Sequence, residues 1–137
     1  GQEFMRTKKG DPDSYAADKK GGVFWSKIDE VNAIDLKMKD KYSDVYNTYK
    51  GLIALRKANP DAFGANKDAK AETFFEDLKG VTKYTTRNFC VYFNATDSDV
   101  KVTTTGYTKS VDVSSGTPKD AEIVSTVPAK SFVILEE

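Results

Sequence analysis

Histidine is missing from this chain and cysteine occurs only once, and each shortage excludes a class of site. Without histidine, the chain cannot form a Ser-His or Cys-His catalytic pair from its own residues, nor a histidine-based zinc site. With a single cysteine it cannot form an internal disulfide. Cys90 lies in the alternating run 89–93, which favours a packed strand thiol over a nucleophile, because free cysteine is among the most buried residue types.

A net charge and long apolar runs are missing as well. The 21 Lys and Arg residues balance 21 Asp and Glu residues, so the chain lacks the electrostatic footprint of a nucleic-acid binder or of a protein that binds anionic membrane surfaces. No apolar run approaches the roughly 20 residues that a membrane helix needs. We therefore expect neither nucleic acid nor membrane as a partner. The 39% of hydrophobic residues is enough for part of the chain to bury a core.

The acidic residues of the C-terminal half do not form a metal-binding pattern. Asp97, Asp99 and Asp112 lack the spacing of an EF-hand loop. We interpret them as solvated charges of turns and strands, and expect no metal and no cofactor. Asn94-Ala95-Thr96 matches the N-glycosylation pattern, but we interpret it as the entry to a turn.

One helix is predicted, over residues 43–58. Ser43 is a plausible N-cap, and Asn59-Pro60 ends the helix because proline cannot continue it. The apolar face of the helix comprises Val45, Tyr49, Leu52, Ile53 and Leu55. Gly51 costs roughly 1 kcal/mol relative to alanine inside a helix, and its small size permits close packing against a neighbour. Residues 1–42 show no sustained period of 2 or 3.6, so we expect an irregular segment there.

From about residue 72 onward the pattern indicates β-structure. The runs rich in β-branched and aromatic residues are 81–86, 89–95, 100–104, 110–113, 123–127 and 131–135. Turn residues such as Lys79-Gly80 and Arg87-Asn88 separate them. Phe74 and Phe75 fit either a further strand or the last turn of a short helix. The predicted fold is mainly β: an antiparallel C-terminal β-sandwich preceded by one α-helix and an irregular N-terminal segment.

The first fifteen residues, GQEFMRTKKGDPDSY, resemble the segment after the eighth barrel strand in pullulanase-type debranching enzymes of the α-amylase superfamily. The residues that fit are Gly1, Glu3, Arg6, Thr7, Lys8, Gly10, Ser14 and Tyr15. The helical run resembles the last barrel helix of that family, through Asp44, Val45, Tyr49, Leu52, Ile53, Leu55, Arg56, Pro60 and Phe63. The resemblance implies two domains: 1–62, the tail of the catalytic (β/α)8 barrel, and 63–137, the C-terminal β-sandwich.

A third motif, residues 28–36, resembles the family segment whose first Asp binds sugar hydroxyls at a substrate subsite. That residue is Asp29, and Asn32 is a second candidate. Leu36 stands where the family has Trp, and residues 16–28 form an insertion that would reshape the rim of the site. Trp25, the only tryptophan, lies in this insertion after two glycines, where its ring can stack on a glucose residue.

The resemblance implies that this chain is part of a larger enzyme, which we call the parent enzyme, and that the chain and the parent have different functions. The parent would be an α-1,6-glucosidase acting on starch-type α-glucans, and extracellular or displayed on a bacterial cell surface. Its catalytic carboxylates come from barrel strands four, five and seven, so we assign no catalytic residue here and expect the missing barrel as packing partner. The alternatives are an independent carbohydrate-binding β-sandwich module and an α-amylase or branching-type parent. Tyr84, Tyr92 and Tyr107 would form the glucan platform of such a module, although aromatics at strand spacing are more often core.

Overall fold

The computed structural model describes residues 2–7, 32–64, 66–68, 73–119 and 122–137. The chain divides into two compact units, Gly1–Tyr46 and Asn47–Glu137. The first unit holds the short helices η1 (Gln2–Phe4) and α2 (Met38–Lys41) and the start of α3 (Ser43–Ala58). Ser43 is the first residue of α3 and not its N-cap, since the Tyr46 amide already donates to the Tyr42 carbonyl at 3.0 Å. The predicted division at residue 62 refers to the parent enzyme and stays a prediction.

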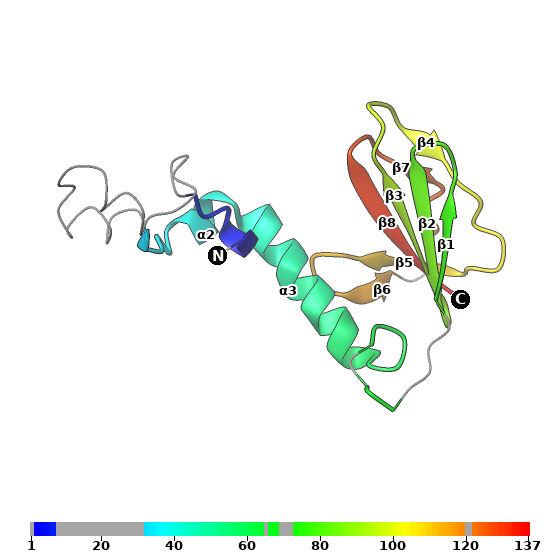
Figure 1. Cartoon of the computed structure of the whole chain (residues 1–137), viewed down its shortest axis with the longest axis horizontal. Helices are drawn as coiled ribbons and strands as arrows, with labels where there is room; N and C mark the ends of the chain where they lie inside the picture. Colours follow the sequence, from blue (N-terminus) through cyan, green and yellow to red (C-terminus); the bar gives the residue numbers. More distant parts are fainter. Residues whose placement is uncertain (1, 8–31, 65, 69–72, 120–121) are drawn as a thin grey trace, which may run out of the picture. The chain divides into compact units, whose positions relative to one another are not determined.

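The described residues of the second unit form two antiparallel sheets (Figure 1). In spatial order, the larger sheet comprises β1 (Thr73–Asp77), β2 (Val81–Thr86), β3 (Phe89–Asn94), β8 (Ser131–Glu136), β5 (Lys109–Asp112) and β6 (Thr117–Lys119). The smaller sheet pairs β4 (Val100–Lys101) with β7 (Thr126–Val127). The fold class predicted from the sequence is therefore confirmed: within the described residues the chain is mainly β, with antiparallel sheets and one main helix, α3.

The predicted strands differ from the observed ones mainly at the edges of the sheets. Residues 73–77 form a strand, which decides between the two alternatives for Phe74 and Phe75. The strand at 117–119 was not predicted, because it is short and has Pro118 at its centre. Two predicted runs, 100–104 and 123–127, contribute only two ladder residues each.

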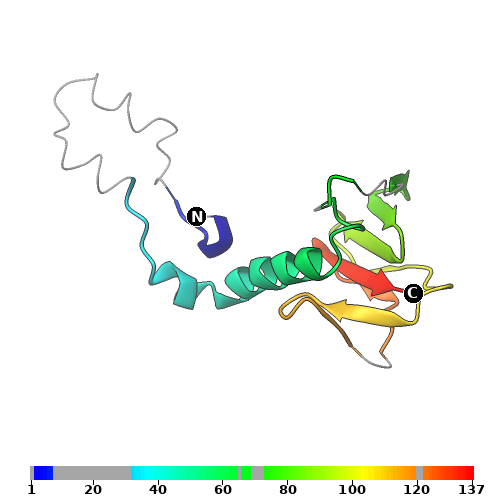
Figure 2. The same cartoon turned by 90° about the horizontal axis from the view of Figure 1, so that it is seen from below.

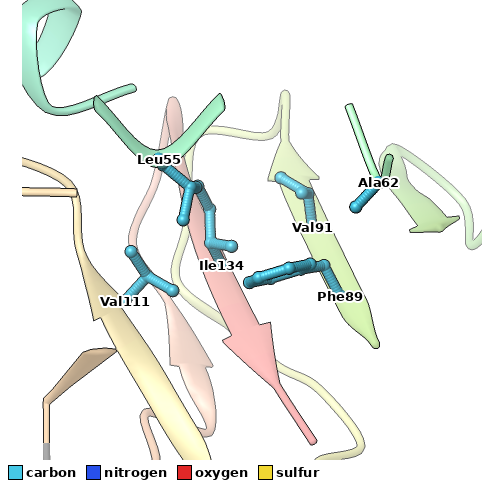
Figure 3. Close-up of a cluster of buried hydrophobic side chains, with 6 residues drawn as sticks. All are labelled: Leu55, Ala62, Phe89, Val91, Val111 and Ile134. Carbon is cyan, nitrogen blue, oxygen red and sulfur yellow. The ribbon is translucent and has the colours of Figure 1, made fainter. Parts of the chain in front are cut away.

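The face of the large sheet that meets α3 carries one hydrophobic cluster. Its buried members are Leu55, Ala62, Phe89, Val91, Val111 and Ile134 (Figure 3). Cross-strand register places Val91 opposite Ile134, and Leu55 projects from α3 towards this pair. Figure 2 shows the C-terminal end of α3 lying next to β8. Part of the predicted apolar face of the helix is therefore buried against the sandwich.

A second hydrophobic cluster lies on the opposite face, under the small sheet. It comprises Val81, Cys90, Tyr92, Val127 and Leu135, with Val100, Val102, Tyr107 and Val133 packed against it. Cys90 is fully buried here, as predicted for a packed strand thiol. Since both clusters are built from alternate residues of the same strands, the period-2 pattern of the sequence corresponds to a sheet that is covered on both faces.

Gly51 allows α3 to approach the loop between β5 and β6 at backbone distance. A Cβ atom at Gly51 would collide with the Val113 carbonyl oxygen and would lie 2.8 Å from the Ser114 carbonyl carbon. On the other side of the contact, Gly116 has φ +74° and its own Cβ would collide with the Gly51 carbonyl oxygen. The contact therefore needs a glycine on both elements, as the sequence suggested for Gly51.

We expect the stability of the second unit to fall in alkaline solution because of Tyr107. Burial and a hydrogen bond with Cys90 raise the pKa of the Tyr107 phenol to about 12. Because the phenol holds its proton more tightly in the folded chain than in the unfolded chain, it stabilises the folded state. This stabilisation is fully present below the unfolded pKa of about 10 and is lost as the pH rises through the folded pKa. Urea unfolding at a series of pH values should show Tyr107→Phe losing less stability than the native chain between pH about 10 and 12. Identical pH profiles would contradict this account.

Candidate functional site

Four aromatic side chains from adjacent strands share the α3 side of the large sheet, and we call them the aromatic band: Phe75 (β1), Tyr84 (β2), Phe93 (β3) and Phe132 (β8). Phe75 is the direct cross-strand partner of Tyr84, with ring centroids 5.0 Å apart. Phe93 is the direct partner of Phe132, with centroids 6.0 Å apart. Tyr84 is opposite Val91, so the two pairs lie on neighbouring rows of the sheet and the band crosses it diagonally.

An apolar groove of about 310 Å³ lies between the aromatic band and α3. It is lined by Leu52, Leu55, Arg56, Phe63, Tyr84, Val91, Phe93, Phe132 and Ile134. Arg56 is the only charged residue among them, and its guanidinium donates a long hydrogen bond of 3.5 Å to the Gly64 carbonyl. A groove of this size and lining is suited to a ligand or surface with an apolar face and no net charge.

Polar groups lie at the end of the band where β3 stops and β8 begins. A shallower hollow of about 500 Å³ is lined there by Phe93, Asn94, Ala95, Lys130, Ser131 and Phe132. The Lys130 ammonium donates to the Ala95 carbonyl at 2.7 Å and pairs with the Asp97 carboxylate at 3.0 Å. Hydrogen-bonding groups therefore border the phenyl rings.

The register adds two further polar side chains beside the band. Asp77 is opposite Thr82, Thr82 is opposite Phe93, and Phe93 is opposite Phe132, so these four residues form one row on the same face of the sheet. Asp77 and Thr82 are both exposed. This face thus combines exposed rings with a carboxylate and a hydroxyl.

The three tyrosines proposed for a glucan platform do not share a surface. Tyr84 belongs to the aromatic band, whereas Tyr92 and Tyr107 pack in the cluster on the opposite face. The Tyr92 hydroxyl donates to the Thr103 carbonyl at 2.8 Å, and burial raises its pKa well above the usual range. Phe75, Phe93 and Phe132 were not singled out from the sequence. Only the cross-strand register places them on the same face of the sheet as Tyr84.

The candidate substrate residues belong to the first unit. Trp25 and Asp29 lie outside the described residues. Asn32 is exposed, and its carbonyl accepts a hydrogen bond of 2.9 Å from the Arg6 guanidinium. This hydrogen bond joins two described positions that are 26 residues apart in the sequence.

Asn94 is a structural residue, in agreement with its interpretation as a turn entry. Its side-chain amide is buried and donates to the carbonyls of Ser98, Val127 and Pro128, at 2.8, 3.1 and 3.0 Å. Its side-chain oxygen accepts from the Thr96 amide and hydroxyl at 2.9 and 2.7 Å. With its amide committed to three carbonyls, Asn94 is not presented for glycosylation.

Within the described ranges, no three His, Cys, Asp or Glu residues are grouped so as to hold a metal ion. Likewise, none of the helices in the described ranges has the length and apolar character to span a bilayer. In comparisons with known proteins, no family model matches the chain, and a search of curated proteins finds no significant relative.

Proposed function

We propose that this chain is the C-terminal part of a pullulanase-type α-1,6-glucosidase that acts on starch-type α-glucans, and that it is itself non-catalytic. The motifs around Arg6 and Asn32 and the helical run 43–58 support the proposal by their resemblance to that family. The order of elements agrees with it, since in the described part of the chain the long helix α3 precedes the antiparallel strands. In this proposal the sandwich supports the catalytic barrel, and the three barrel carboxylates lie elsewhere in the parent.

The observation that carries this proposal is that α3 is apolar on two sides. Gly51 and Leu55 are buried against the sandwich. Tyr49 and Ile53 lie on another side of the same helix, and they are 39% and 53% exposed. A helix that packs on a barrel with one side and on a sandwich with the other needs an apolar face on each side. In the isolated chain, the face without a partner leaves its large apolar side chains in water. The exposed pair is the face that we assign to the barrel.

The substrate side of the parent would receive Asp29, Asn32 and Trp25 from the first unit. Asp29 and Asn32 would bind sugar hydroxyls, and the Trp25 ring would stack on a glucose residue. Through these residues the glucan substrate of the parent enzyme is also a binding partner of this chain. The proposal involves no cofactor. We place the parent outside the cell or on the surface of a bacterium, as the resemblance implies.

The decisive experiment is to read the residues encoded immediately upstream of Gly1. We expect a (β/α)8 barrel whose fourth, fifth and seventh strands end in the carboxylates of a retaining glycosidase. An upstream region of a different fold would overturn the proposal. It would favour the second candidate, an independent carbohydrate-binding module, for which the exposed aromatic band is the supporting observation.

The isolated chain is expected to have no glycosidase activity. Incubation with pullulan and with soluble starch, followed by a reducing-end assay, should give the same reading as a blank without protein. The physical reason is that a retaining mechanism needs a nucleophile and a general acid about 5–5.5 Å apart, and the proposal places both in the barrel. Activity above the blank that disappears when an acidic residue of this chain is replaced would contradict the non-catalytic assignment.

A further inference from the structure

The two edges of the six-stranded sheet are built differently. One edge is β6, which is short, with Pro118 at its centre and Lys119 at its end. Proline lacks an amide donor and lysine resists burial, so both residues discourage a further strand from pairing there. The other edge is β1, which has neither residue and pairs only with β2 among the described strands (Figure 1). The β1 edge is therefore open to pairing.

β1 is apolar on both of its faces. All five of its residues are exposed, and the side chains of Phe74 and Phe75 are 63% and 72% exposed. These two side chains point to opposite faces of the sheet, because they are neighbours on one strand. An exposed apolar edge strand is a template for the addition of another strand. An added strand would continue both faces and cover both rings, which a ligand on one face cannot do.

The hydrogen bonds of the β1–β2 hairpin show which backbone groups of β1 face outward. The Leu78 amide donates to the Val81 carbonyl at 2.8 Å, so these two residues form a hydrogen-bonded pair. Such pairs alternate with non-hydrogen-bonded pairs in an antiparallel ladder, so every second residue back from Leu78 bonds to β2. The residues between them direct their amides and carbonyls to the free edge, and they are Thr73, Phe75 and Asp77.

The charges and the length of β1 favour one register for the pairing of two copies. A two-fold axis at Phe75, the middle residue, pairs the whole strand with itself and places Thr73 opposite Asp77. The outward-facing groups then meet one another, and no two carboxylates are opposite. An axis at Glu76 or at Asp77 would place like charges directly opposite each other, which is destabilising. The net charge of zero adds no long-range repulsion between copies.

We propose that the chain forms a two-fold dimer in which β1 of one copy pairs antiparallel with β1 of a second copy. The outward-facing amides and carbonyls of Thr73, Phe75 and Asp77 form the hydrogen bonds of the interface. On one face the two Phe75 rings meet, and each continues into its partner Tyr84, whose ring centroid is 5.0 Å away. On the other face the two Phe74 rings are diagonal neighbours, within reach of each other. The dimer thus covers both exposed rings of each copy.

Cysteine crosslinking tests the register. In the dimer the Cα atoms of the two Phe75 residues are about 5.5 Å apart, the spacing of a hydrogen-bonded pair, and a disulfide can span this distance. The two Phe74 positions are about 7–8 Å apart, which is too far. After mild oxidation and alkylation of free thiols, Phe75→Cys should give a covalent dimer on a non-reducing gel. The matched variant Phe74→Cys should stay monomeric, and the native Cys90 should not react because it is fully buried.

Sedimentation velocity between about 1 μM and 1 mM tests the dimer itself. The sedimentation coefficient of the native chain should rise with concentration from the monomer value to the dimer value. Phe75→Pro should raise the Kd of the dimer about a hundredfold, because both copies lose an outward-facing amide donor and a ring. The β1–β2 ladder does not use this amide, so the variant should still unfold cooperatively. Phe75→Ala keeps the amide and should raise the Kd about tenfold, which provides a second variant if proline disrupts the strand.

Three results would overturn the proposal: a native chain that stays monomeric at about 1 mM, equal crosslinking of Phe75→Cys and Phe74→Cys, or a dimer that neither Phe75→Pro nor Phe75→Ala weakens. The last result would place the interface elsewhere, for example on the exposed Tyr49 and Ile53 of α3. All of these measurements use the chain alone and do not depend on the sequence upstream of Gly1. Failure of this inference and failure of the proposed function are therefore distinguishable.

Discussion

Replacing Asn94 by alanine is expected to lower the free energy of unfolding by about 3–4 kcal/mol, since several buried hydrogen bonds are lost together. The Asn94 side chain links the end of β3 to the carbonyls of Ser98, just before β4, of Val127, the last residue of β7, and of Pro128 after it. Alanine would remove the Asn94 donor from all three carbonyls, of which Ser98 keeps the Thr96 hydroxyl, and would open a space at a position that is only 3% exposed. Urea unfolding followed by circular dichroism measures the effect.

Asn88→Ala is the appropriate control for this prediction. Asn88 makes one side-chain hydrogen bond, at 3.3 Å to Glu136, and is half-buried. Its replacement should cost less than about 1 kcal/mol, because a single long hydrogen bond contributes little net stability. Asn94→Asp should resemble Asn94→Ala, since a carboxylate keeps the acceptor but loses the donor. If Asn94→Ala costs no more than Asn88→Ala, Asn94 does not join these segments.

The second large effect is expected for Leu55→Ala, at about 2–5 kcal/mol, the usual range for truncating a buried leucine. Leu55 is 3% exposed and packs between α3 and the sheet, in the cluster with Phe89, Val111 and Ile134. Its removal would leave a cavity at the place where the helix rests on the sandwich. Thermal and urea unfolding of the isolated chain measure the loss.

Ile53→Ala provides the matched control on the same helix. Ile53 is 53% exposed, so its truncation should change the stability of the isolated chain by less than about 0.5 kcal/mol. In the parent enzyme, by contrast, the proposed function predicts that Ile53 becomes buried and that the same change destabilises the protein. If Ile53→Ala and Leu55→Ala had equal effects in the isolated chain, the helix would not be docked by the face described above.

Several elements of this fold follow from local sequence alone. The helix over 43–58 has the observed end residues, because apolar spacing and the Asn59-Pro60 stop act within a few residues. The turn at Lys79-Gly80 was also predicted, although the strand before it was not: Lys79 and Gly80 adopt φ of 59° and 93°, which suits a two-residue turn. The central strands β2, β3 and β8 were found because their alternation is long and regular.

The candidate site was only partly accessible to sequence reasoning. Tyr84 was singled out together with Tyr92 and Tyr107, yet the register puts Tyr84 on one face and Tyr92 on the opposite face, where Tyr107 packs against the same cluster. Phe132 joins the band from a strand that follows Phe93 by more than thirty positions in the chain. Which distant strands pair, and in which register, is set by packing of the whole sheet, and no local pattern contains that information.

The sequence by itself thus determined the type and place of α3 and of the central strands β2, β3 and β8, because backbone preference, alternation and turn chemistry are local. It also determined that Gly51 permits a close approach, since only glycine lacks a Cβ. The tertiary structure decided what approaches Gly51, namely the loop of Gly116, and which carbonyls the Asn94 amide reaches. It also decided which aromatic rings form one exposed surface. These features depend on contacts between residues far apart in the chain, and such contacts form only when the sheets and α3 pack together.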